Sequence, residues 1–103
     1  PAAFFFEIGQ TKLSVKELEH LDYFMNNVLP YVKGKKATIL TGSADKGTGT
    51  TKRNQQLCEK RAEYLKNLLA EKYGVDTGDY KINTNISAEG NPELQRAAII
   101  SFE

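Results

Sequence analysis

An acidic and a basic residue flank the start of one expected helix, and their types suit the binding of a small charged ligand. Asp45 lies in a glycine-rich stretch, and Arg61 lies on the second or third turn of a helix expected from about Lys52 to Tyr73. A helical side chain leans toward the N-terminus of its own helix, so Arg61 can reach toward the loop that carries Asp45. Backbone N–H groups at a helix start also attract anions. A ligand with an ammonium and a carboxylate group would fit between the two side chains.

The elements that must position this pair are a strand, a turn and a helix. Residues Ala37 to Thr41 form the expected strand, and Gly42 to Gly49 form a glycine-punctuated turn. The helix that follows has Gly74 as its C-terminal glycine. Its apolar positions recur at helical spacing, which predicts a buried face: Leu57, Ala62, Leu65 and Leu69.

The N-terminal part of the chain predicts a strand and a helix. Its short apolar run suits a strand covered on both faces: Phe4, Phe5, Phe6 and Ile8. Ser14 and Glu17 form a capping box, in which each side chain bonds to the other residue's backbone N–H. The apolar stripe of the helix that follows comprises Leu18, Leu21, Phe24, Met25, Val28 and Leu29, and Pro30 and Gly34 end that helix.

Two further strands complete the expected fold. Residues Tyr80 to Ile86 alternate in a strand pattern, and Ala97 to Phe102 form the last strand. The order β-α-β-α-β-β predicts an α/β sandwich, with a small mixed four-stranded sheet and two main helices packed on one face. In this prediction the last strand joins the sheet as a hairpin partner of the strand before it.

Composition limits the classes of function. The 103 residues suffice for one domain, and a net charge of +1 with mixed signs along the chain predicts no nucleic-acid partner. The single cysteine, Cys58, is expected to be a buried or half-buried thiol. The single histidine, His20, lies among acidic residues on an expected solvated face, so we expect no metal site. No apolar run approaches the roughly 20 residues that span a bilayer.

Other interpretations of the glycine-rich turn lead to different functions. Gly42 and Gly47 have the spacing of a phosphate-binding P-loop, but Thr48 stands where that motif requires lysine. No Ser-His pair, paired carboxylates or zinc ligands converge on this loop to support hydrolysis, so no catalytic residue and no cofactor are expected. Asp45 alone could serve only its own turn. Arg61 alone could be a structural arginine, bound to Asp45 or Glu59.

The order of these residues nevertheless resembles a known family. The patterns G-x-x-D, from Gly42 to Asp45, and N-x-x-L-x-x-x-R-A, from Asn54 to Ala62, resemble the peptidoglycan-binding domain of the outer membrane protein A (OmpA-like) family. The resemblance extends to the opening strand around Phe4 to Glu7 and to Gln95-Arg96 before the last strand. It covers nearly the whole chain and implies the same α/β sandwich.

The resemblance also implies a ligand and a cellular setting. Members bind the diaminopimelate of the peptidoglycan stem peptide without enzymatic chemistry. Carried over, Asp45 would receive the ligand's amine and Arg61 its carboxylate, with further bonds from Asn54 and from loop amides at Gly47, Thr48 and Gly49. The expected setting is the periplasm, within a longer exported protein that an upstream part attaches to the outer membrane, as a barrel or through a lipid anchor.

The chain departs from the family pattern at four points, and two of these, Gly9 and Gln95, favour an alternative. The Asp45 to Asn54 interval has one extra residue, and the other three are Gly9, Cys58 and Gln95. They affect residues around the central acid and base rather than the pair itself. The alternative is therefore an OmpA-like fold whose ligand site is retired and which serves as a protein interaction module.

Overall fold

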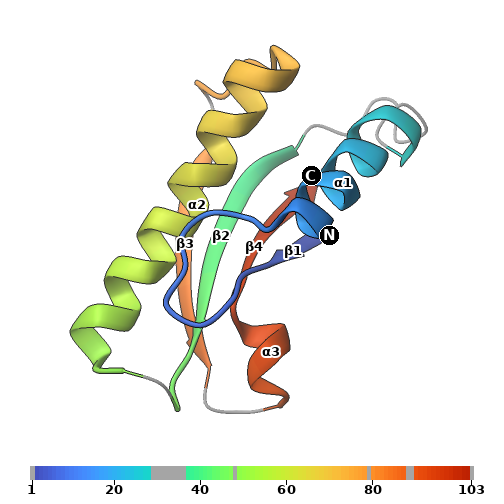
Figure 1. Cartoon of the computed structure of the whole chain (residues 1–103). Helices are drawn as coiled ribbons and strands as arrows, with labels where there is room; N and C mark the ends of the chain where they lie inside the picture. The colour runs from blue at the N-terminus through green and yellow to red at the C-terminus, as the bar shows by residue number, and fades with distance from the viewer. Residues whose placement is uncertain (1, 29–36, 48, 79, 88–89, 103) are drawn as a thin grey trace.

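The computed structural model describes residues 2–28, 37–47, 49–78, 80–87 and 90–102. Its centre is one four-stranded sheet in the order β1-β4-β2-β3. Central β4 is antiparallel to both of its neighbours, whereas β2 and β3 are parallel. The strands are β1 (Ala2–Phe5), β2 (Ala37–Asp45), β3 (Lys81–Ser87) and β4 (Ala97–Phe102) (Figure 1).

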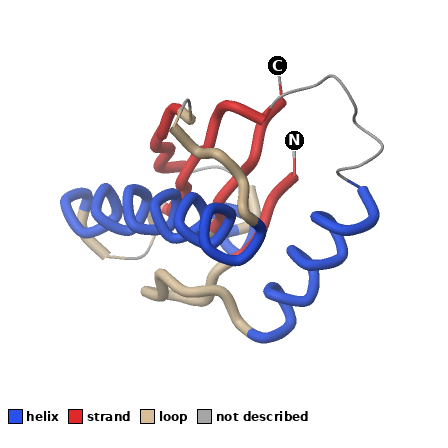
Figure 2. The backbone as a smooth tube through the Cα atoms, turned by 90° about the horizontal axis from the view of Figure 1, so that it is seen from above, coloured by secondary structure: helices blue, strands red, loops and turns tan. Residues whose placement is uncertain are grey.

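Two main helices cover the same face of this sheet (Figure 2). They are α1 (Val15–Tyr23), which continues as the π-helical turn η1 (Phe24–Val28), and α2 (Thr51–Tyr73). The predicted α/β class, the mixed four-stranded sheet and the two helices are therefore confirmed. A short helix that the sequence analysis did not predict, α3 (Pro92–Gln95), precedes β4. None of the described helices has the length and apolar composition needed to cross a bilayer.

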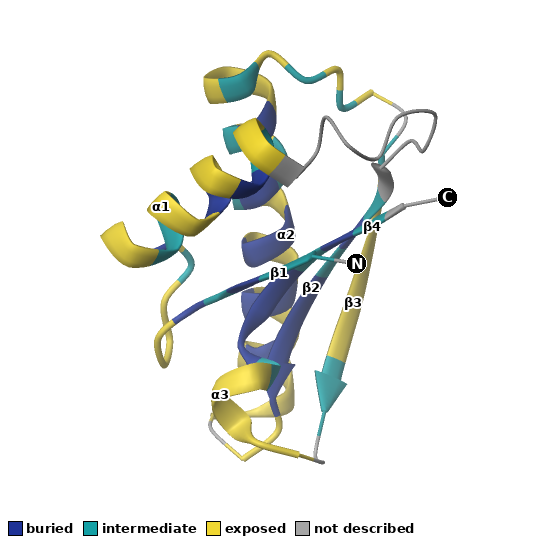
Figure 3. Cartoon of the chain, turned by 90° about the vertical axis from the view of Figure 1, so that its right-hand side faces the viewer, coloured by how far each residue is buried: buried dark blue, intermediate teal, exposed yellow. Residues whose placement is uncertain are grey.

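The last strand was wrongly predicted to pair with β3. Instead, β4 enters between β1 and β2, with Ala98 opposite both Phe4 and Gly42. Burial explains the choice, because Ala97, Ala98 and Ile100 of β4 are buried, as a central strand requires. β3 is mostly exposed and occupies an edge (Figure 3). The bounds of the third strand were predicted within one residue. Most of its side chains, however, are exposed rather than packed in the core.

Capping residues set the ends of the helices. The Thr50 side chain accepts a hydrogen bond from the Arg53 N–H at the start of α2, and Gly74 ends the helix with a φ of 65°. Ser14 caps α1 by accepting from the Glu17 N–H. The prediction that the Glu17 side chain bonds back to the Ser14 N–H is wrong, because its carboxylate accepts from the Phe5 N–H and contacts His20 instead. The predicted end of α1 at Pro30 and Gly34 lies outside the described residues.

The strand β2 continues through the expected turn. Gly42 to Asp45 extend β2, and the turn begins only at Lys46. Gly42 is needed for close packing rather than for a turn, because a Cβ atom there would lie 1.7 Å from the Cys58 carbonyl oxygen. The close approach of α2 to β2 brings the end of the strand and the start of the helix together.

The main apolar core lies between the sheet, α1 and the second half of α2. Its buried members include Phe4, Leu21, Leu40, Leu65 and Leu69. The predicted burial of Phe4 and Phe6 is confirmed, but Ile8 is 60% exposed, because β1 ends at Phe5. Phe5 is only partly buried, so the prediction of a strand covered on both faces was wrong for this edge strand.

Candidate functional site

The buried polar residues of the described chain gather at one end of the fold, where β2 ends and α2 begins. They are Ser43, Asp45, Asn54, Arg61 and Arg96. A small apolar cluster of Ala44, Leu57 and Cys58 is separate from the main core, and Ala44 and Leu57 line the same pocket as four of the polar residues. Burying polar groups costs free energy unless they find partners, so their partners indicate what this end of the fold does.

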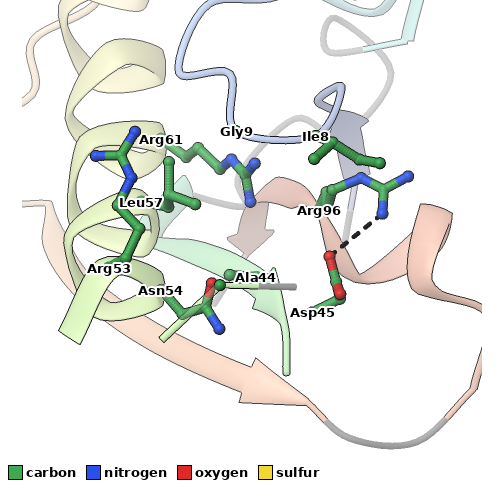
Figure 4. Close-up of a pocket in the computed structure, with 10 residues that line it drawn as sticks. Ile8, Gly9, Ala44, Asp45, Arg53, Asn54, Leu57, Arg61 and Arg96 are labelled. Carbon is green, nitrogen blue, oxygen red and sulfur yellow. Dashed lines mark hydrogen bonds and ion pairs between the residues drawn. The ribbon is translucent and has the colours of Figure 1, made fainter. Parts of the chain in front are cut away.

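Four of these five side chains line a small pocket of about 120 Å³. Ligand pockets for whole drug-sized molecules are typically about 300–1,000 Å³, so this one suits a single end of a ligand. The lining residues come from the first loop, the end of β2, the loop after it, the first turns of α2 and the residue between α3 and β4 (Figure 4): Ile8, Gly9, Ala44, Asp45, Gly49, Arg53, Asn54, Leu57, Arg61 and Arg96.

Asp45 forms an ion pair with Arg96, not with Arg61. Its Oδ2 lies 3.2 Å from Nη1 of Arg96, and both side chains are largely buried (Figure 4). Arg96 also donates from Nε to the Phe6 carbonyl, at 3.3 Å. The register explains the pairing: Ser43 of β2 lies opposite Ala97 of β4, so the residues just beyond this pair are neighbours.

Arg61 instead holds the backbone around the pocket. Its guanidinium is 0% exposed and donates to three carbonyls, those of Gln10 and Ser43 at 2.9 Å and that of Glu7 at 3.4 Å. Its Cζ also lies 5.2 Å from the centre of the Phe6 ring. Burial lowers the pKa of this guanidinium below its usual value. Arg61 thus ties the first loop and β2 to α2.

Asn54 presents a buried amide to the pocket. The residue is 2% exposed and lines the cavity, and its side-chain amide makes no hydrogen bond within the described part of the chain. An amide carries both donors and an acceptor, and leaving them unpaired inside a protein costs about 1–3 kcal/mol. Such a group favours a bound ligand or water that can pair with it.

The charge of the pocket wall is positive. Three arginines, Arg53, Arg61 and Arg96, face one carboxylate, that of Asp45. Arg53 is exposed, whereas the other two arginines are buried. Within the described chain, no group of three or more His, Cys, Asp or Glu side chains could hold a metal ion. The wall can therefore bind a negatively charged or zwitterionic group.

The structure brings together most of the predicted site residues. Asp45, Gly49, Asn54 and Arg61 all line the pocket, whereas Gly47 does not, and Thr48 lies outside the described residues. Asp45 and Arg61 were predicted to lie together as an acid and a base that both face a ligand. They do not, because each side chain binds another partner in the protein. Cys58 is buried as expected, and burial raises the pKa of its thiol.

Two charged pocket residues, Arg96 and Arg53, were not among the predicted site residues. Arg96 had a usable signal, because Gln95-Arg96 stands where the closing strand of OmpA-like domains would begin, but the predicted pairing of that strand with β3 separated Arg96 from Asp45. The only signal for Arg53 was its position beside Asn54.

Comparison with known proteins gives no family for this chain. Neither the protein-family models nor the curated protein sequences compared with this chain match it.

Proposed function

We propose that this domain binds peptidoglycan non-covalently by holding the free amino acid end of diaminopimelate in the stem peptide. The observation that carries the proposal is the pocket itself, in which the buried carboxylate of Asp45 and the buried amide of Asn54 lie among three arginines. The resemblance of the G-x-x-D and N-x-x-L-x-x-x-R-A patterns to OmpA-like domains supports the same ligand. The small volume supports recognition of one end of it.

In the proposed complex, Asp45 receives the ligand's ammonium group. A carboxylate offers about four acceptor positions, so it can accept from an ammonium group while it is paired with an arginine. We assign the ligand's carboxylate to Arg96, whose guanidinium is next to Asp45, with the amide of Asn54 as a further partner. This assignment replaces Arg61, because Arg61 is fully buried and donates to three carbonyls.

The proposed role is a tether and involves no reaction. Charge-assisted hydrogen bonds contribute about 1.5–3 kcal/mol each, so a few of them give only modest affinity. Attachment of the parent protein to the outer membrane would confine the domain near the cell wall and raise the effective concentration of its ligand. A weak site then suffices. The proposed setting is the periplasm, with contact to the membrane only through the rest of the parent protein.

The test is co-sedimentation of the purified domain with peptidoglycan sacculi. Asp45→Asn should remove most binding, because a neutral amide cannot neutralise the ligand's ammonium group. Asp76→Asn makes the same charge change on a residue outside the pocket and should bind as wild type.

Asp45→Asn also deprives Arg96 of its buried partner, so we expect a loss of about 1–3 kcal/mol in stability. Binding is therefore compared at a temperature where a thermal melt shows both variants folded. Equal sedimentation of Asp45→Asn and wild type would contradict the proposal.

A second candidate is the protein interaction module with a retired ligand site. The observation that favours it is Arg61, which has no exposed surface and gives its donors to the backbone. Under this alternative the wild-type domain does not sediment with sacculi, and the Asp45–Arg96 pair serves only to hold β2 against β4. The wild-type arm of the same experiment therefore separates the two candidates.

A further inference from the structure

The first turn of α2 carries positive charge at the positive end of the helix dipole. Lys52 and Arg53 follow the N-cap residue Thr50, and no acidic residue lies in this turn. Helix starts are stabilised by negative charge and disfavour cations. The local electrostatics of this 23-residue helix therefore favour an anion supplied from outside the chain.

Asn54 independently indicates that a ligand enters at this point. The residue is 2% exposed and lines the pocket, and its side-chain amide has no hydrogen-bond partner in the described chain. Arg53, one position earlier, lines the same pocket but is exposed to solvent, which places it at the mouth of the pocket. Its guanidinium lies on the side away from Asp45 and Arg96 (Figure 4). Within the described residues, the Arg53 side chain also makes no hydrogen bond or ion pair.

We infer that Arg53 binds a second carboxylate of the ligand at the mouth of the pocket. This inference rests on the proposed function. Diaminopimelate has two ends, each with an amine and a carboxylate on one carbon, and a cavity of about 120 Å³ holds only one of them. The other end then lies outside, where the exposed guanidinium of Arg53 can pair with its carboxylate.

The state of that second carboxylate depends on the length of the stem peptide. It is a free anion when the stem ends at diaminopimelate, and it is part of a neutral peptide bond when another residue follows. Arg53 therefore makes the site prefer stems that end at diaminopimelate. Exposed ion pairs contribute up to about 1 kcal/mol, so the expected preference is about threefold to fivefold.

The experiment compares two synthetic tripeptide stems by calorimetry at low salt. Both end in diaminopimelate and keep its distal amine and carboxylate, but one has a free C-terminal carboxylate and the other a C-terminal carboxamide. Wild type should bind the free acid about threefold to fivefold more tightly. Arg53→Gln should bind both equally. Lys52→Gln removes the same charge from the same exposed turn, outside the pocket lining, and should keep the preference.

The outcomes separate this inference from the proposed function. Equal binding of both peptides by wild type, or a full preference retained by Arg53→Gln, overturns the role of Arg53 and leaves the proposed function standing. Loss of the preference in Lys52→Gln as well as in Arg53→Gln indicates general attraction by the charged turn and also overturns a specific role for Arg53. Failure of wild type to bind either peptide overturns the proposed function and this inference with it.

Discussion

The two ends of the same sheet differ in how their buried residues are used. At one end, apolar side chains of α1 and the second half of α2, such as Leu21 and Leu65, pack against apolar side chains of the sheet, such as Phe4. At the other end, β2 finishes and α2 begins around buried polar groups and a pocket. The apolar end gains stability from burial, whereas the polar end loses some of it by burying groups that need partners. The difference indicates that the first end stabilises the fold, and it is the second end that we propose binds a ligand.

The largest expected effect comes from breaking the apolar end. Leu65 is fully buried, so Leu65→Ala removes apolar contacts and leaves a cavity, at a cost of about 3–5 kcal/mol in the free energy of unfolding. Urea denaturation measures the loss. Ligand affinity of the variant that remains folded should equal that of wild type, because the pocket lies at the other end. A large change in that affinity would contradict the division into two ends.

A smaller loss is expected at Arg61, which lies at the polar end but serves the structure. Arg61→Lys keeps the charge but cannot reach all three carbonyls with one ammonium group, so we expect a loss of about 1–3 kcal/mol. Amide hydrogen exchange should increase around Gln10 in the first loop. Ligand affinity should fall only as far as the pocket loosens. A strong affinity loss with unchanged stability would instead assign Arg61 to the ligand's carboxylate.

The smallest effect concerns pH at the apolar end. Tyr73 packs against the main core and donates to Asp22 Oδ1 at 3.0 Å, and burial together with this bond raises its pKa to about 12. The fold thus favours the neutral phenol. Its contribution to stability is complete below the ordinary tyrosine pKa of about 10 and is lost as the pH rises toward 12. Tyr73→Phe should weaken the decline in stability over this range, as followed by denaturation at stepped pH. An identical decline in both proteins would contradict the assignment.

The sequence was sufficient for the elements whose signals are local. The helical spacing from Leu57 to Leu69 and Gly74 at the end predicted α2 within one residue of its observed bounds, although its N-cap, Thr50, was not predicted. The bounds of β4 were also predicted, because its residues form an apolar run. The partner of β4 was not, since strand pairing depends on contacts between distant segments that a single sequence does not specify.

The same limit applies to the site. The pattern from Asp45 to Arg61 located the pocket, because both residues belong to adjoining elements. It could not show that Asp45 pairs with Arg96, since that contact follows from the position of β4 beside β2. Nor could it show that Arg61 donates to Glu7 and Gln10, because the path of the first loop is set by packing.

The most direct test of the difference between the two ends is an NMR titration of the domain with a diaminopimelate-containing muropeptide. We expect saturable shifts in the backbone amides around the pocket, at Gly9, Asp45, Gly49 and Asn54. Amides at the apolar end, such as those of Leu21 and Leu69, should not shift. An absence of saturable shifts, or shifts confined to residues outside the pocket, would contradict the assignment of the polar end to ligand binding.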